Sequence, residues 1–377
     1  MERSPGFHAY KFPHSTPFEA MLAKLCANCR LFTVGEREAG RSLQHHRSFA
    51  TFHDATTYGC SICTRLWARL YPKGDPVPSK DEEDNISVYA SFRTASDAED
   101  DEELIGCRFE ISRRYSLGLT VDFDLLGDES RSYGGVYELT AIDTLATQDH
   151  RHMLQVIDHE IAPSTDSIFT TKLIQHWLFS CQSNHTSCQP TNLQCPLPLR
   201  VIDVGTIGQS SVRLLVSGSS PEYGSYITLS HCWGNPNIIK LTIENEPALR
   251  AGFPIQDLPK TFRDAIQVTR ALSVKYLWID SLRILQNSVD DWRHQSALMG
   301  EIYRNCFCNI AATSSGNSDG GLFFKREPHL LKPLNLTIKW KSGGGLARHG
   351  RCYLWDSDLW DRCVRDAPLN RRGWVLQ

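Results

Sequence analysis

Residues 226–324 alternate between strand and helix patterns, and this alternation constrains the fold more than any other feature of the chain. Three strand-like segments, at 226–230, 276–280 and 306–312, are separated by two helix-like segments. Strands that are joined through helices pair in parallel, and the crossover between them is right-handed. The sequence therefore predicts an α/β fold with a parallel-sheet βαβαβ core.

Both helix-like segments carry start signals. In the first, Asp257 is placed as a cap and Pro259 falls in the opening turn, before apolar residues at helical spacing. In the second, Ser288 and Asp291 have the spacing of a capping box. These signals predict helices over about 257–272 and 288–303.

Polar residues follow each strand-like segment. Parallel strands end at one edge of the sheet, and open sheets bind ligands in the crevice beyond that edge. We therefore expect one site, with Asp280 accepting hydrogen bonds from ribose hydroxyls and Arg283 pairing with phosphate. Neither a G-x-G-x-x-G nor a P-loop sequence is present. The expected ligand-binding residues are Ser230, Trp233, Gly234, Ser281, Arg283 and Ser314, and the ligand class is NAD or another nucleotide, or a partner surface.

Two other interpretations of the strand-end residues stay open. One is an enzyme in which Cys232 is the nucleophile, His231 or another histidine the base, and Asp280 the orienting group. Neighbouring strand residues face opposite ways, so His231 and Cys232 could pair only if the chain turns there. The other is purely structural, with Trp233 and Trp278 as core aromatics, Cys232 as a small buried hydrophobe and Asp280 as a cap.

Two C-x-x-C pairs, Cys26/Cys29 and Cys60/Cys63, have the spacing by which two thiolates reach one zinc ion. Both pairs fall in segments with helical patterns, 18–32 and 57–71, where residues three apart share a face. Structural zinc and buried free thiols are therefore both consistent with the spacing. A second candidate ligand set consists of His176, Cys181, His185 and Cys188.

Composition and charge narrow the class of protein. The chain has 377 residues with 40 basic and 43 acidic side chains, so its charge gives no reason to expect a nucleic-acid or membrane surface. No apolar run reaches membrane-spanning length, and no signal peptide is apparent. Thirteen cysteines, an odd number, fit a reducing compartment, and we expect a cytoplasmic protein.

Pattern changes along the chain suggest four regions. They are a helical, cysteine-rich region at 1–75, a region of acidic linkers and β-strands at 76–165, a helix and hairpin at 166–220, and the βαβαβ core at 221–377. Strands are expected at 86–92 and within 107–126, a helix at 170–181, and a hairpin from 200–204 and 212–216.

The chain resembles the fungal heterokaryon incompatibility (HET) domain through seven ordered motifs. These are 226–234 (YITLSHCWG), 258–266 (LPKTFRDAI), 276–282 (YLWIDSL), 291–292 (DW), 302–305 (IYRN), 321–323 (GLF) and 372–377 (RGWVLQ). Upstream segments around Cys60/Cys63, at 177–188 and at 197–203, resemble the region that precedes the core in many members of the family.

The resemblance implies a role in fungal non-self recognition, in which fusion of incompatible cells triggers programmed cell death. It implies partners among other incompatibility proteins, or self-association. The family is distantly similar to the Toll/interleukin-1-receptor (TIR) fold, so the core is expected to be TIR-like or flavodoxin-like. Some TIR domains cleave NAD with a glutamate one turn after a helical tryptophan, which makes NAD cleavage a hypothesis for this chain.

The chain departs from the family pattern at positions that bear on this chemistry. Gln295 stands at the catalytic position where the family has glutamate, and a carboxamide cannot act as a general base or stabilise a cation by its charge. Arg283 replaces a cysteine, and His231 stands where tyrosine is common. The sequence ends at Gln377, before a glutamate that often follows, so the core is expected to be truncated at its C-terminus.

Overall fold

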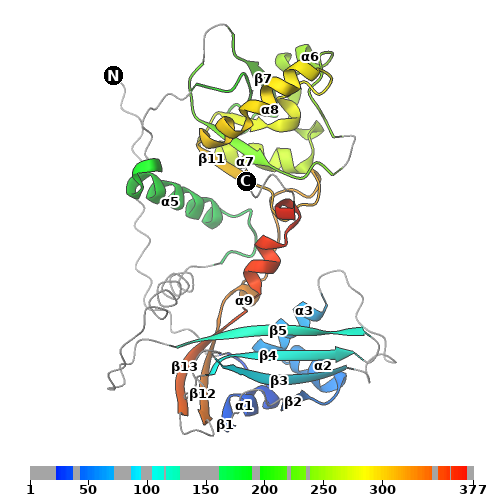
Figure 1. The fold of residues 1–377 in the computed structure, drawn as a ribbon, viewed down its shortest axis with the longest axis vertical. Coiled ribbons are helices and arrows are strands. Elements are labelled where there is room, and N and C mark those ends of the chain that lie inside the picture. The colour runs from blue at the N-terminus through cyan, green and yellow to red at the C-terminus, as the bar shows by residue number, and fades with distance from the viewer. Residues whose placement is uncertain are drawn as a thin grey trace. The chain divides into compact units, whose positions relative to one another are not determined.

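The computed structural model describes residues 23–36, 43–71, 86–94, 104–113, 116–127, 161–188, 196–218, 222–234, 238–341, 347–356 and 358–371. These residues fall into two compact units (Figure 1). The first unit is drawn from 1–161 and 328–359, and the second from 162–327 and 360–377. Each unit is built on its own β-sheet.

The first unit contains a seven-stranded sheet in the order β1-β12-β13-β5-β4-β3-β2. All neighbouring strands are antiparallel except β1 and β12, which are parallel. Strands predicted at 86–92 and within 107–126 are confirmed as β3, β4 and β5. The strands are β1 (Val34–Glu36), β2 (Leu43–His46), β3 (Ile86–Thr94), β4 (Leu104–Arg113), β5 (Ser116–Gly127), β12 (Leu334–Lys341) and β13 (Ala347–Asp356).

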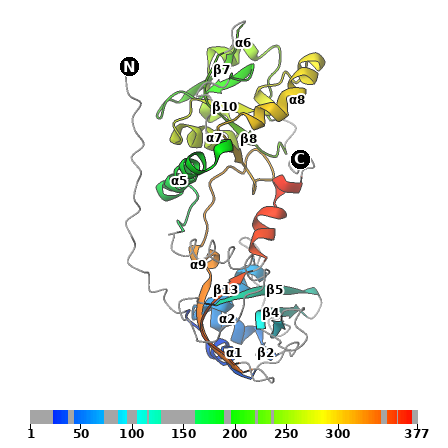
Figure 2. The same ribbon diagram turned by 60° about the vertical axis from the view of Figure 1, so that its left-hand side comes forward.

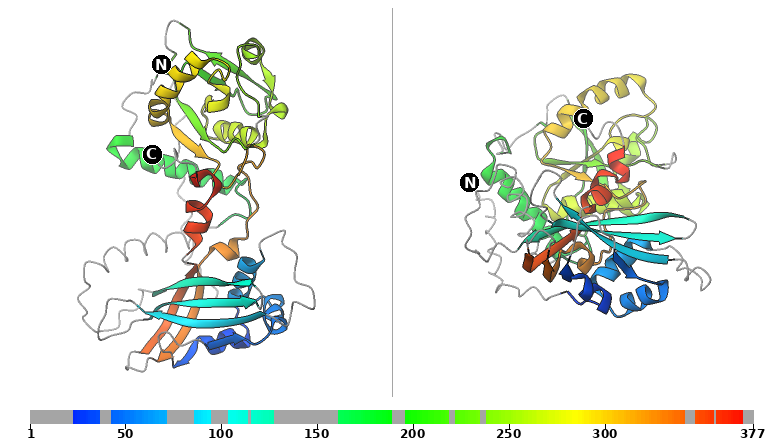
Figure 3. Two further views of the ribbon diagram at one scale, coloured as in Figure 1. Left: turned by 45° about the vertical axis from the view of Figure 1, so that its right-hand side comes forward. Right: turned by 60° about the horizontal axis from the view of Figure 1, so that its bottom comes forward.

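The helices of the first unit differ from the sequence prediction. They are α1 (Ala27–Phe32), α2 (Phe49–Thr57), α3 (Ser61–Leu70) and the single turn α9 (Pro328–Leu331). Residues 23–26 are not helical, so the predicted helix over 18–32 begins only at Ala27 within the described residues. The predicted helix over 57–71 is interrupted because Gly59 has φ +81°, a left-handed conformation that ends α2 before α3 begins. Figures 1 and 3 show α1, α2 and α3 gathered against one face of the sheet.

The second unit contains a six-stranded sheet in the order β11-β8-β10-β6-β7-β9. β8 pairs in parallel with both β10 and β11, which confirms the predicted parallel core. The predicted hairpin is confirmed as β6 and β7, and these strands and β9 are added in antiparallel fashion, so the sheet is mixed. The strands are β6 (Arg200–Asp203), β7 (Ser211–Val216), β8 (Tyr226–Ser230), β9 (Phe253–Pro254), β10 (Tyr276–Ile279) and β11 (Cys308–Ala311).

Helices cover both faces of this second sheet. Phe262 and Ile266 of α7 (Lys260–Ala271) pack with Leu229 on one face. On the other face, Ile302 of α8 (Val289–Arg304) packs with Trp278, and Tyr226 Oη donates a hydrogen bond of 2.7 Å to the carbonyl oxygen of Ile302. The core is therefore a sheet between two helical layers, as crossovers on opposite faces require (Figure 2).

The helix starts are partly as predicted. Ser288 caps α8, accepting a hydrogen bond from the Asp291 amide at 3.3 Å, which confirms the capping interaction. Asp257 does not cap α7, because Pro259 occupies the N-cap position and Asp257 ends a preceding 3₁₀ turn. The remaining helical elements of the second unit are α5 (Ile168–Asn184), α6 (Glu246–Ala251), and the short turns Thr186–Cys188, Ile255–Asp257, Asp280–Leu282, Asp361–Arg365 and Pro368–Arg371.

Within the described residues, no helix combines the length and the apolar composition that crossing a bilayer requires. The motif at 372–377 lies outside the described residues.

Candidate functional site

The loops that leave β8 and β10 are joined by the carboxylate of Asp280. Trp233 Nε1 donates to its two oxygens at 3.1 and 3.0 Å, and the backbone amide of Ser281 donates to Oδ1 at 2.7 Å. Hydrogen bonds to an ionised carboxylate are stronger than bonds between neutral groups. Asp280 therefore fixes the ends of two neighbouring parallel strands to each other.

The loops that leave β8 and β11 are also in close contact. Ser318 Oγ lies 3.3 Å from the carbonyl oxygens of both Cys232 and Trp233, to which it donates. Gly234 has φ +67°, and a Cβ at this position would lie 2.3 Å from the Cβ of Asn317. Loops 231–234, 280–283 and 313–318 therefore meet at one edge of the sheet, and we call them the strand-end rim.

His231 and Cys232 are neighbours in the rim, but their side chains have different surroundings. The His231 side chain is 1% exposed, its Nδ1 lies 3.9 Å from Asp280 Oδ1, and its ring packs edge-on against Phe262. Cys232 is buried, and its recorded hydrogen bond reaches its carbonyl oxygen rather than its thiol. His231 therefore lies beside Asp280, and among the described residues the Cys232 thiol makes no hydrogen bond.

Arg283 and Gln295 lie inside the unit rather than on its surface. Arg283 is 1% exposed and donates from Nη2 to the carbonyl oxygen of Leu277 at 3.1 Å. Burial, and then the neighbouring Arg200 charge, holds the pKa of Arg283 well below its usual range. Gln295 is 4% exposed, and among the described residues its Nε2 has no hydrogen-bond partner, nor do Arg283 Nε and Ser281 Oγ.

An ion pair beneath the rim anchors α8. Arg200 of β6 makes two parallel hydrogen bonds to the Asp291 carboxylate, at 2.9 and 3.0 Å, and a third at 3.0 Å to the carbonyl oxygen of Arg283. Asp291 also accepts from the backbone amide of Leu285 at 2.8 Å. The pair therefore joins β6, the loop after β10 and the first turn of α8.

The residues of the rim that face solvent are few. Gly234, Ser314, Gly316 and Asn317 are exposed, and the partly exposed residues are Trp233, Asp280, Thr313 and the neighbouring Ser230. Ser230 Oγ lies 3.2 Å from Asn309 Oδ1 on the neighbouring strand. A ligand or partner at the rim would therefore meet small hydroxyl side chains, the Asn317 carboxamide, one indole and part of the Asp280 carboxylate.

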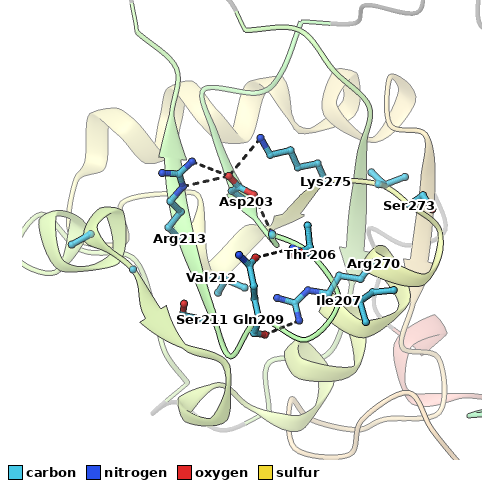
Figure 4. Close-up of a pocket in the computed structure, with 14 residues that line it drawn as sticks. Asp203, Thr206, Ile207, Gln209, Ser211, Val212, Arg213, Arg270, Ser273 and Lys275 are labelled. Atoms are coloured by element: carbon cyan, nitrogen blue, oxygen red, sulfur yellow. Dashed lines mark hydrogen bonds and ion pairs between the residues drawn. The ribbon is translucent and has the colours of Figure 1, made fainter. Parts of the chain in front are cut away.

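A cavity of about 910 Å³ lies at the other edge of the same sheet (Figure 4). Its wall includes Asp203 at the end of β6, which pairs with Tyr276 at the start of β10. Figure 4 shows Arg213 and Lys275 converging on Asp203, at 3.1 and 3.8 Å, while Arg270 donates to the carbonyl oxygen of Gln209 at 2.9 Å. Three cations and one carboxylate are among the residues that line the cavity, so its wall carries an excess of positive charge.

The two C-x-x-C pairs of the first unit meet in space. Cys29 Sγ lies 3.6 Å from Cys63 Sγ and 3.4 Å from Cys60 Sγ, and Cys26 Sγ lies 3.9 Å from Cys63 Sγ. These four thiols could hold a metal ion. In the second unit, Cys181, His185 and Cys188 also lie together, at a partly exposed to exposed position, whereas His176 is not in that group.

Two histidines at the thiol cluster were missed by the sequence analysis. His45 and His46 end β2, in a stretch that the sequence suggests is a polar loop, yet both are buried against the cysteines. His45 Nε2 lies 3.1 Å from Cys29 Sγ, and His46 Nε2 lies 3.2 Å from Cys63 Sγ. Burial lowers the pKa of His45 to about 3, so this imidazole is neutral. Two adjacent histidines between two C-x-x-C pairs are the sequence pattern that could have predicted their place beside the thiols.

Comparison with known proteins identifies the part of the chain that carries the rim. Residues 226–377 match the family model of heterokaryon incompatibility protein (HET). These residues are a HET domain. The HET domain supplies the parallel strands β8, β10 and β11 to the second unit, and the strands β12 and β13 to the sheet of the first. No curated protein and no solved structure matches the chain.

Proposed function

We propose that the chain acts in fungal heterokaryon incompatibility as an interaction and signalling module, and that the strand-end rim of its HET domain is the contact surface. In this proposal, engagement of the rim after fusion of incompatible cells promotes regulated cell death in the cytoplasm through a TIR-like domain. The partner is another incompatibility protein or a second copy of the chain.

The observation that carries the proposal is the order of the parallel strands. β10 and β11, the second and third strands in the chain, lie on opposite sides of β8, the first. Connections that run to opposite sides of one strand create a topological switch point, where open sheets bind their ligands. The rim residues lie at the carboxyl ends of these strands, which is where the switch point opens.

A protein surface fits the rim better than NAD or another nucleotide. The two Asp280 oxygens that would receive ribose hydroxyls already accept bonds from Trp233 and Ser281. Arg283, which would pair with phosphate, is buried. The exposed groups that remain are hydroxyls, backbone, the Asn317 carboxamide and the indole of Trp233, and tryptophan is enriched in protein interfaces.

The enzymatic alternatives draw less support from the same residues. Glycosidic cleavage of NAD needs a carboxylate, and the residue at that position is the buried carboxamide of Gln295. Acyl or hydrolytic chemistry at Cys232 needs a base in contact with the thiol, and among the described residues the thiol makes no such hydrogen bond. Binding is therefore the function that the rim supports best.

The proposal is tested by blocking each edge of the sheet in turn. Ser314 at the rim and Ser211 at the cavity of Figure 4 are both exposed, so Ser314→Arg and Ser211→Arg add the same bulk and charge at opposite edges. Each variant is expressed from an inducible promoter in a filamentous fungus that is incompatible with the strain from which the chain comes. Cell viability is measured by dye exclusion, and immunoblots check that the protein levels are equal.

We expect the chain as given and Ser211→Arg to cause cell death, and Ser314→Arg to leave viability at the level of uninduced cells. Equal killing by both variants would remove the rim as the contact surface. Failure of the chain as given to affect viability in any fusion would instead contradict the role in cell death.

A further inference from the structure

We propose that Cys26, Cys29, Cys60 and Cys63 bind one zinc ion as four thiolates, and that His45 and His46 donate hydrogen bonds to these thiolates without coordinating the metal. The centre belongs to the first unit, whereas the rim belongs to the second, and its role is to hold the first unit together. The proposal is independent of the function proposed for the HET domain.

The separations of the sulfur atoms fit a tetrahedral site. Zinc–thiolate bonds of about 2.3 Å place the sulfur atoms of a tetrahedron about 3.8 Å apart. The three recorded Sγ–Sγ distances are 3.4, 3.6 and 3.9 Å. A disulfide would bring two sulfur atoms to about 2.05 Å. An iron–sulfur cluster would spread the thiolates over separate iron atoms, and therefore further apart.

Each C-x-x-C pair lies at the start of a helix, which sets the direction of its thiols. Cys26 is the N-cap of α1, and its sulfur accepts a hydrogen bond from the Cys29 amide at 3.4 Å. Cys60 is the N-cap of α3, and Cys63 follows in the first turn. Backbone N–H groups at these positions favour the thiolate over the thiol.

His46 is assigned as a hydrogen-bond donor by its contact with Asn28. Asn28 Nδ2, which can only donate, lies 3.1 Å from His46 Nδ1. With this orientation of the Asn28 amide, His46 Nδ1 accepts and a proton on Nε2 faces Cys63 Sγ at 3.2 Å. A nitrogen that carries this proton donates to the thiolate and does not bind zinc.

His45 is placed in the same way toward the other pair. Its Nε2 lies 3.1 Å from Cys29 Sγ. Four-coordinate zinc has no position left for a fifth or sixth ligand once the four thiolates are bound. Outer groups of this kind orient the ligands and reduce the negative charge on sulfur.

The surroundings of the cluster indicate a structural role. Cys29, Cys60 and Cys63 are fully buried, and they pack in one hydrophobic cluster with Phe52 and Leu66. The four thiols and two histidines join three short elements, α1, β2 and α3. Closed four-ligand sites of this kind contribute to folding rather than to catalysis.

The test measures metal content on the full chain, purified without added metal or chelator. We expect one zinc per chain by mass spectrometry of the metal, and a cobalt-substituted form whose thiolate-to-cobalt charge-transfer intensity corresponds to four thiolates. Cys60→Ser and Cys63→Ser should lose zinc. Cys363→Ser, at an exposed thiol of the second unit, is the matched control and should retain it.

The histidine variants separate the two roles. We expect His45→Gln and His46→Gln to keep one zinc and the four-thiolate cobalt spectrum, while zinc affinity falls by about 10–100-fold. A mixed sulfur–nitrogen spectrum in place of the four-thiolate spectrum in the chain as given would overturn the assignment, as would retention of this zinc by Cys60→Ser and Cys63→Ser.

A measurement on the unsubstituted chain guards against variants that do not fold. Alkylation of the native chain should spare four thiols until a chelator removes the metal, after which those four react. Zinc near zero with these thiols reactive from the start, iron in place of zinc, or a disulfide among the four would each contradict the proposal.

Discussion

Asp291→Ala is expected to lower the free energy of unfolding of the second unit by about 3–5 kcal/mol. The carboxylate of Asp291 is the partner of Arg200, whose side chain is 8% exposed, and it also accepts from the Leu285 amide. Its removal leaves Arg200 buried without a counter-charge, next to Arg283, whose own burial already disfavours the charged guanidinium. The cost is that of an uncompensated buried charge and not only that of the lost bond.

Asp290→Ala is the matched control for this prediction. Asp290 is also an aspartate of the first turn of α8, so both substitutions remove one negative charge from the same end of the helix, but Asp290 is exposed. Urea unfolding is followed by hydrogen-exchange mass spectrometry. Peptides from β10 and α8 belong to the second unit, so their exchange gives the free energy of unfolding of that unit separately from the first. A difference of less than about 0.5 kcal/mol between the two variants would mean that the Arg200 pair does not anchor the helix.

Gly234→Ala is expected to destabilise the second unit by about 2–4 kcal/mol, because two costs combine. The φ of +67° is left-handed, and an added Cβ would lie 2.3 Å from Asn317 Cβ and 2.9 Å from its Cα. Because one of these atoms belongs to the backbone, the loop after β11 would have to move away from the loop after β8.

Gly316→Ala provides the comparison for Gly234→Ala. Gly316 lies in the same rim, and a Cβ added there would meet no atom within 4 Å. The same urea and hydrogen-exchange measurement should show an effect within about 0.5 kcal/mol of zero for Gly316→Ala. Equal effects of the two substitutions would show that the loops are not in contact.

The local signals in the sequence predicted the elements whose causes are local. The parallel core followed from alternating strand and helix patterns, and the start of α8 followed from the spacing of Ser288 and Asp291. The separation of α2 from α3 did not, because the helical pattern of 57–71 continues through Gly59 and only its positive φ reveals the break.

Features that depend on distant pairings were not predicted. β13 pairs with β5, placing Cys352 opposite Gly127, and nothing in either segment identifies the other. Arg283 follows a strand end and has a charged side chain, which predicts exposure, yet the loop turns it into the interior beside Arg200. The burial of His45 and His46 depends likewise on the packing of β2 against the cysteine-bearing helices.

The central claim is that the loops leaving the parallel strands gather into one rim, and a double-mutant cycle between Trp233 and Asp280 tests it most directly. Trp233→Phe keeps an aromatic ring but removes the indole N–H that bonds the carboxylate, and Asp280→Ala removes the acceptor. We predict a coupling free energy of about 1.5–3 kcal/mol from urea unfolding of the single and double variants. Additive effects within about 0.5 kcal/mol would contradict the rim.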